Sequence, residues 1–288
     1  MKPLTFALRS SPPQRLDLSS LTPQSLAGKS IGEIESIELQ TTRARITAGD
    51  VFRISRGDAT KIHFAGGSER FDRVGYGMTH GSIVVDGDVG VEAGRLMAGG
   101  QLSVRGDAGA FAASGLKGGL LEVSGDVGER LGGPLSGETM GMRGGLVRVR
   151  GNAAERAGDR MRRGMILVEG HAGPYAGSLM IAGTLVIGKQ AGDLPGYLMG
   201  RGTIVLGKQA SMLAPTFVDC GEHDLVAARL LGAYIGATSP RLADLFRRPL
   251  RRFAGDQAAL GKGEILLAQW NPGTKQGSAA SHDPKVLR

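Results

Sequence analysis

The chain has 288 residues, a formal net charge of +8 and 48 glycines, while aromatic residues make up only 5% of it. Collagen would need glycine at every third position together with abundant proline, and that period is absent. A disordered chain would lack the regular valine, isoleucine and leucine found between residues 83 and 206, so the glycines must belong to a folded repeat.

The first 50 residues are predicted to form a cap on the repeat. LTFALR predicts an edge strand, and LTPQSLAGK combines a Thr-Pro helix start with a glycine stop. The N-terminus has no apolar stretch of signal-peptide length, and no window of the chain resembles a membrane span. With a single cysteine, which permits no internal disulfide, these features predict a cytoplasmic protein that contacts no membrane.

Residues 51–207 are predicted to form a glycine-rich repeat of 19 residues, which begins with irregular copies such as VFRIS and KIHFA. One spacing is 26 residues, which equals a unit with a seven-residue insertion around residues 132–140. The units begin at Gly81, Gly100, Gly119, Gly145, Gly164, Gly183 and Gly202.

Aliphatic residues occur two and four positions after each starting glycine, which is the period of a strand with one buried face. Stacking such strands in parallel would place Val85, Val104, Val123, Val149 and Val168 in one interior column. The glycine offsets of six, nine and thirteen are uneven, which favours three unequal sides. The sequence therefore predicts an all-β fold: a right-handed parallel β-helix of about seven 19-residue coils.

Two further columns follow from the repeat. A ladder of methionines, with Leu116 as one rung, is predicted to fill the core. The residue between the two aliphatic positions is mixed, as expected of an outward face. These outward residues are Val84, Ser103, Glu122, Arg148, Leu167, Val186 and Val205.

A column of polar residues follows the glycines at offset six. Stacked acidic residues could bind a metal, but Asp and Asn also close turns by bonding local backbone amides, and we favour the turn role. The column consists of Asp88, Asp107, Asp126, Asn152 and His171.

Residues 208–288 are predicted to form an arm that is helical and then disordered. Helical patterns cover residues 225–236 and the stretch up to Pro249, one short strand is expected at residues 265–268, and residues 271–288 are polar. Cys220, Glu222 and His223 share one short segment, but a zinc site would need distant ligands as well.

Arginines supply 26 of the 35 basic residues. Because guanidinium groups recognise carboxylates and no stacking aromatics accompany them, we expect an acidic protein partner and no nucleic acid, with plain solvated faces as the alternative. The partner-docking candidates are Arg160, Arg162, Arg163, Arg247, Arg248, Arg251 and Arg252. No nucleophile, base and oxyanion set can be assembled, so no catalytic residue and no metal site is predicted.

The run G-x-[IL]-x-V-x-G-D-x-G, followed by APTFVDCGEHDL and RRFAGDQAALGKGEIL, resembles the C-subunit of formylmethanofuran dehydrogenases over roughly residues 60–270. It is more similar to the C-subunit of the bacterial formyltransferase/hydrolase complex, and more remotely to the C-terminal β-helix of glutamate synthase.

The resemblance implies a non-catalytic structural component of a multi-subunit complex that acts in one-carbon oxidation. That complex transfers a formyl group from tetrahydromethanopterin to a methanofuran-type carrier and hydrolyses it to formate. The implied partners are an amidohydrolase-like A-subunit, a B-subunit and a formyltransferase D-subunit, which would hold the carrier, the pterin and a metal. The alternatives are a molybdenum or tungsten formylmethanofuran dehydrogenase and an independent β-helix enzyme.

Overall fold

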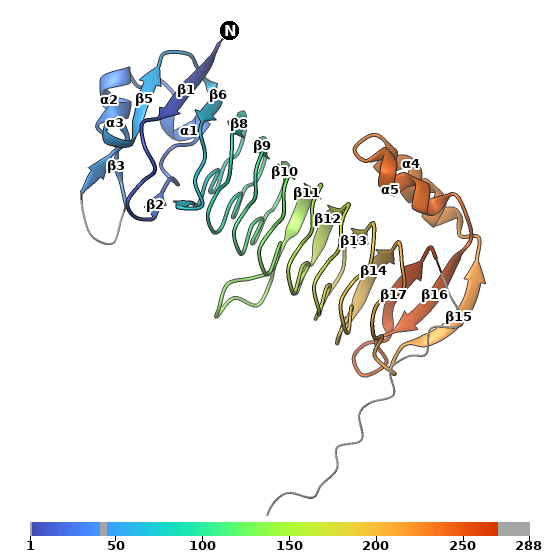
Figure 1. Cartoon of the computed structure of the whole chain (residues 1–288). Coiled ribbons are helices and arrows are strands. Elements are labelled where there is room, and N and C mark those ends of the chain that lie inside the picture. The colour runs from blue at the N-terminus through green and yellow to red at the C-terminus, as the bar shows by residue number, and fades with distance from the viewer. Residues whose placement is uncertain (1, 41–44, 270–288) are drawn as a thin grey trace, which may run out of the picture.

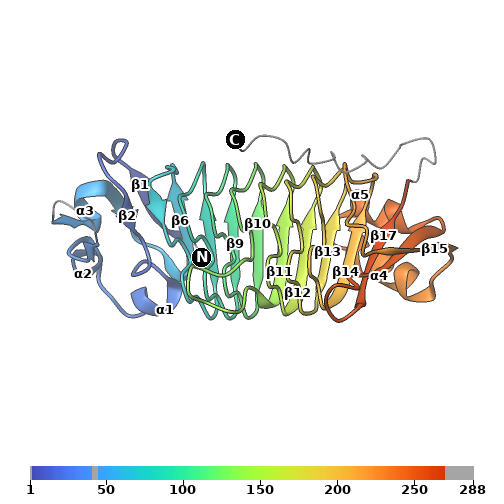
Figure 2. The same cartoon turned by 90° about the horizontal axis from the view of Figure 1, so that it is seen from below.

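The computed structural model describes residues 2–40 and 45–269, and these residues form a mainly β structure. Thirteen strands make one mixed sheet, in the order β15-β16-β17-β14-β13-β12-β11-β10-β9-β8-β6-β1-β5. The strands stack in a row, with an N-terminal group of short elements at one end and a C-terminal helical arm at the other (Figure 1 and Figure 2).

The N-terminal part ends the sheet with an antiparallel pair. Strand β1 lies parallel to β6 on one side and antiparallel to β5 on the other, so the last parallel edge is covered. Four phenylalanines, Phe6, Phe52, Phe64 and Phe71, pack together beneath these strands. The Thr-Pro helix start is confirmed as α1, and the predicted strand forms as β1, but β1 is not an edge strand, because β5 lies outside it in the sheet. The elements are β1 Pro3–Leu8, β2 Leu16–Asp17, α1 Pro23–Leu26, α2 Ile31–Glu35, β3 Glu38–Leu39, β4 Ile46–Thr47, α3 Ala48–Val51, β5 Phe52–Ser55, β6 Asp58–Ala65 and β7 Phe71–Asp72.

The repeats supply seven strands that pair in parallel, each with the next. Val85 lies opposite Val104, and Val104 opposite Val123, so equivalent residues of successive units stand in one column. All the predicted interior aliphatics are buried. A second column of parallel bridges, such as Ala153 with Ala172, joins the same units away from the sheet. These strands are β8 Ser82–Val85, β9 Gln101–Val104, β10 Leu120–Val123, β11 Arg143–Val149, β12 Arg163–Val168, β13 Thr184–Ile187 and β14 Arg201–Leu206.

The methionine ladder explains why each unit starts with glycine. Gly164 has a φ of +92°, and a Cβ on it would lie 2.7 Å from the tip of Met142, the ladder residue that comes before Gly145. Met161 and Gly183 repeat the arrangement one unit later, at 2.9 Å. A side chain at the starting position would therefore suffer both backbone strain and a clash with the core. The predicted core role of the methionines is confirmed.

The seven-residue insertion leaves the stack undisturbed. The amide of Met142 donates to the carbonyl of Gly132 over 2.7 Å, which closes the extra loop at its base. Strand β11 then pairs with β10 in the same register as elsewhere, with Val123 opposite Val149.

The C-terminal part differs from the predicted helical arm. It does contain helices, but three of its strands also extend the sheet: β17 pairs in parallel with β14, and β16 and β15 follow antiparallel. The strand expected at residues 265–268 is therefore longer and has two further strands beside it. Residues 270–288, which include the stretch predicted to be disordered, lie outside the described residues. The elements are β15 Val218–His223, α4 Val226–Gly236, α5 Pro240–Ala243, the 3₁₀ helix η1 Asp244–Phe246, β16 Leu250–Gly255 and β17 Lys262–Leu267.

One part of the outward-face prediction is wrong. The sequence predicts that Leu167, Val186 and Val205 face outward, yet all three are fully buried. Residues of the arm, including Ile235 and Phe246, pack on them in a second apolar cluster. The helical arm therefore lies over the outer face of β12, β13 and β14 (Figure 1).

Candidate interaction site

The docking candidates in FRRPLRRF divide into two kinds. Arg247 and Arg248 are exposed, and Arg247 contacts Asp244 at 3.0 Å. Arg251 and Arg252 instead lie on β16 and bind acidic residues of the neighbouring strands. The Arg252 Nε donates to Glu264 on β17 over 2.9 Å.

Arg251 forms a two-pronged ion pair with the carboxylate of Asp219 on β15. Its Nη2 and Nε donate to Asp219 Oδ2 over 2.6 and 3.0 Å. These hydrogen bonds lower the pKa of Asp219 below its usual value. Arg251 and Arg252 therefore hold β15, β16 and β17 together.

The candidates in the repeat are also divided. Arg160 donates from Nη1 to the carbonyl of Glu138 over 3.3 Å, at the inserted loop. Arg162 and Arg163 are exposed, just before and at the start of β12. The structure thus places Arg162 and Arg163 four strands away from β16 in the sheet order.

Sequence reasoning missed the other basic residues at this position. All of them except Lys262 follow the ladder of buried methionines, where the chain turns into the next strand. The Arg143 amide donates to the carbonyl of Leu116, and the Arg162 amide to that of Met142. Arg143 lies opposite Arg163, and Arg201 opposite Lys262. We call this row the cationic corner; its six exposed members are Lys117, Arg143, Arg162, Arg163, Arg201 and Lys262.

The signal for this row was present in the sequence. Lys117, Arg143 and Arg162 each come directly after a rung of the ladder, whereas Arg163 and Arg201 come two positions after one. Because these basic residues occur at two different offsets from the ladder, comparing the repeats at one offset does not reveal that they lie in one row.

The polar column at offset six bonds from unit to unit. The Asp126 amide donates to Asp107 Oδ1 over 2.7 Å, and the Asn152 amide to Asp126 Oδ1 over 2.7 Å. Asp88 and His171 continue the pattern at its two ends. These side chains bond backbone amides as predicted, but the predicted local turn role is wrong, because stacking brings the amide of the next unit to each side-chain oxygen.

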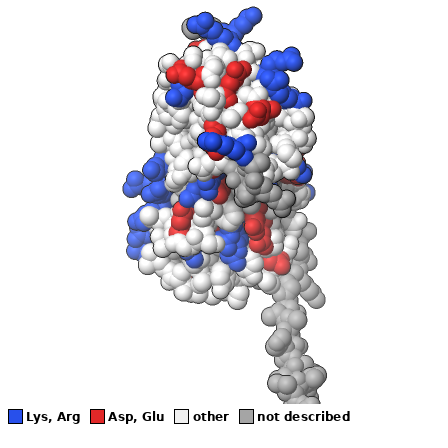
Figure 3. Space-filling view, turned by 90° about the vertical axis from the view of Figure 1, so that its left-hand side faces the viewer, with Lys and Arg blue, Asp and Glu red and all other residues white. Residues whose placement is uncertain are grey.

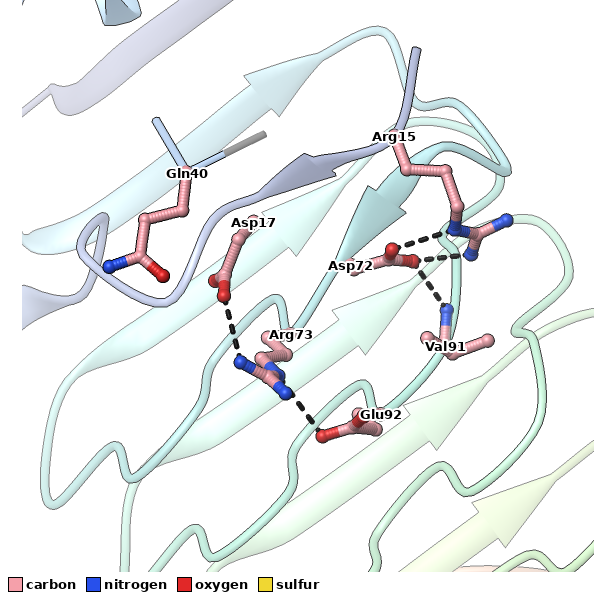
Figure 4. A pocket seen from close by; sticks show the side chains of 7 residues that line it. All are labelled: Arg15, Asp17, Gln40, Asp72, Arg73, Val91 and Glu92. Carbon is pink, nitrogen blue, oxygen red and sulfur yellow. Dashed lines mark hydrogen bonds and ion pairs between the residues drawn. The ribbon is translucent and has the colours of Figure 1, made fainter. Parts of the chain in front are cut away.

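A hollow of about 330 Å³ lies where the N-terminal part meets the first repeats (Figure 4). Seen from that end, acidic and basic side chains are intermixed on the surface (Figure 3). In the hollow, Arg73 contacts Asp17 at 2.9 Å and Glu92 at 3.1 Å, and Arg15 binds Asp72. The bond to Asp72 raises the pKa of Arg15. These opposite charges face one another, so the hollow is held together by ion pairs.

The segment with Cys220 is part of strand β15. Cys220 is exposed, and the His223 ring lies 2.9 Å from the carbonyl oxygen of Cys220 through its Nε2. Among the described residues, no group of three or more His, Cys, Asp or Glu side chains is arranged to hold a metal.

Helix α4 has an apolar outer face. Val226, Leu230 and Tyr234 lie one turn apart and are about two-thirds exposed. Ala228, Gly232 and Ile235 on the opposite side are buried. In the part of the chain that the structure describes, no helix is long and apolar enough to cross a membrane.

Comparison with known proteins identifies the family. No family model matches the chain. A curated relative from Methylorubrum extorquens, the C-subunit of the formyltransferase/hydrolase complex Fhc, is 44% identical over 86 residues, which are 30% of this chain and 32% of the relative's length. A chain in the crystal structure of the formyltransferase/hydrolase complex (FhcABCD) from Methylorubrum extorquens with methylofuran is 44% identical, with a TM-score of 0.87, over 91% of this chain and 98% of that one. The chain belongs to the C-subunit family of formyltransferase/hydrolase complexes.

The resemblance noted from the repeat and the tail motifs is thereby confirmed. Both relatives come from the formyltransferase/hydrolase type, so the comparisons support that type and not the molybdenum or tungsten alternative. The aligned segment spans about a third of the curated relative's own length, whereas the match to the chain in the solved complex is nearly complete.

Proposed function

We propose that this chain is a structural component of a complex that transfers a formyl group from tetrahydromethanopterin to a methanofuran-type carrier and hydrolyses it to formate. The observation that carries the proposal is the 44% identity with a chain of the solved complex that contains methylofuran, in a match that covers 98% of that chain.

We further propose that the chemical steps take place on partner subunits: an amidohydrolase-like A-subunit, a B-subunit and a formyltransferase D-subunit. The carrier, the pterin and any metal would bind there, in the cytoplasm. Support comes from how this chain uses its polar groups. Asp107 and Asp126 accept backbone amides, while Arg251 and Arg252 join strands.

The architecture proposed for this role is a right-handed parallel β-helix of about seven coils. The parallel pairing of the repeat strands and the second column of bridges support it. We propose three parts, residues 1–50, 51–207 and 208–288, with the last contributing β15, β16 and β17 to the sheet. The exposed apolar face of α4 supports a role in an assembly, because monomeric proteins seldom leave such patches bare.

Affinity purification of the native chain tests the proposal. The expected result is recovery of three further subunits and of formyltransferase and formyl-hydrolase activity in the same fraction. The chain purified alone should show neither activity. A monomer with turnover of its own would contradict the proposal and would favour the independent enzyme instead.

A further inference from the structure

The cationic corner carries like charges on adjacent strands of a regular stack, with an interruption at β13. Arg143 and Arg163 lie on adjacent strands, as do Arg201 and Lys262, and neighbouring strands are about 4.8 Å apart. Like charges on adjacent strands repel each other, less strongly in salt. The mutual repulsion of these charges therefore does not stabilise the stack.

Other guanidinium groups on this sheet are matched by acidic side chains. Arg105 contacts Asp86 at 2.7 Å, and Arg148 contacts Glu169 at 2.8 Å. Within residues 2–40 and 45–269, by contrast, no member of the cationic corner forms an ion pair.

The carboxylate beside the corner is already bound. Glu138, on the inserted loop, accepts from Arg95 Nη2 over 2.7 Å. This hydrogen bond, together with the charges of Arg95 and Arg143, lowers the pKa of Glu138. The charge of Arg143 therefore only supplements that of Arg95 near Glu138. The guanidinium group of Arg143 remains available to bind a carboxylate of a second molecule.

Apolar side chains are interleaved with the charges. Ile181 occupies the same position after the ladder in the next unit, where its amide donates to the carbonyl of Met161, and its side chain is 38% exposed. Leu260 lies beside Gly200 in the unit after that and is 54% exposed. Charged and apolar groups in alternation fit a protein surface. A single-stranded nucleic acid would be expected to meet stacking aromatic rings here, and no aromatic residue belongs to the row.

We propose that the cationic corner docks an acidic segment of a partner subunit, with its Asp and Glu side chains placed along the stack from β11 to β17. A guanidinium group can bind a carboxylate through two parallel hydrogen bonds. Arg143, Arg162 and Arg163 would therefore fix the orientation of the bound acidic segment and also add to its affinity. This inference rests on the proposed function, because the partner belongs to the same complex.

The test is a charge reversal in the assembled complex. The variant combines Arg143→Glu, Arg162→Glu and Arg163→Glu. The matched control combines Arg53→Glu, Arg56→Glu and Lys208→Glu, which reverses three exposed charges elsewhere. Binding of each purified chain to the remaining subunits is measured by biolayer interferometry between about 50 and 500 mM salt, a range over which screening changes strongly.

The expected result is at least a tenfold loss of affinity for the corner variant and a change of no more than twofold for the control. The dependence on salt should also become weaker for the corner variant, because fewer charge contacts form. Thermal unfolding of the free chain should be unchanged, and the milder set of Arg→Gln changes should give an intermediate affinity.

Wild-type affinity of the corner variant for the other subunits would overturn the inference. Binding of both chains to duplex DNA is measured in the same way, and a loss of DNA binding in a variant that still assembles would reassign the corner to nucleic acid. If the wild-type chain fails to join the complex at all, the proposed function fails instead.

Discussion

The polar column and the cationic corner repeat the same kind of charge from unit to unit, but they use it differently. Asp107 and Asp126 each accept the amide of the following unit, so their charges are satisfied by the backbone of the chain itself. Arg143 and Arg163 have no carboxylate of the described chain to bind. The short side chains at the turns therefore stabilise the stack, whereas the long side chains at the opposite end of the strands are the ones that we propose bind a partner subunit.

The largest expected effect comes from breaking the polar column at a glycine. In Gly151→Ala the new Cβ would lie 2.2 Å from Asp126 Oδ1 and 2.4 Å from the Gly125 carbonyl oxygen. The backbone must shift, so we expect a loss of about 3 kcal/mol in unfolding free energy, measured by urea denaturation. Gly32→Ala on α2 is the control, since a Cβ there meets nothing within 4 Å. Equal stability of the two variants would contradict the close packing of the column.

A smaller effect should follow from removing one acceptor. Asp126→Ala leaves the amide of Asn152 without its 2.7 Å bond, and we expect a cost of about 1 kcal/mol in urea denaturation. Asp126→Asn keeps an oxygen in place and should retain most of the stability. If both variants lose the same amount, the charge of Asp126 rather than its hydrogen bond stabilises the stack.

The smallest effect concerns Glu138, the carboxylate beside the cationic corner. The Arg95 hydrogen bond lowers the pKa of Glu138 from its usual 4.5, so its contribution to stability is present above that pH and is lost as the pH falls. Glu138→Gln should therefore reduce stability at neutral pH by less than about 1 kcal/mol, because the pair is partly exposed. The difference from the wild type should close under acid conditions. A difference in thermal unfolding that stays constant from neutral to acid pH would contradict this.

The repeat could be predicted because its information is local and recurs. Val104 and Val123 show by their spacing alone which side chains are interior, and the methionines fill the core as expected. The bonds of the polar column could not be placed in the same way, since the nearest amide lies 19 residues along the chain, or 26 across the insertion.

The C-terminal part was harder to predict because its contacts are long-range. Strand β17 pairs with β14 across about sixty residues, and no local pattern indicates that pairing. A signal for the covered face did exist: the outward position changes from Ser103 and Glu122 to Leu167 and Val186 along the chain. This change from polar to apolar residues indicates that another part of the protein covers the outer face of the last units, and in the structure the helical arm does so.

The constant length of the unit also sets a distance. Each repeat advances the stack by one strand spacing of about 4.8 Å, so the gap between the phenylalanine cluster and the helical arm is fixed by how many units separate them. Deleting residues 101–119 would shorten that gap by one step and leave both ends intact. If partner subunits bind both ends, the distance between them can change only in steps of one strand spacing, because whole repeats must be added or removed.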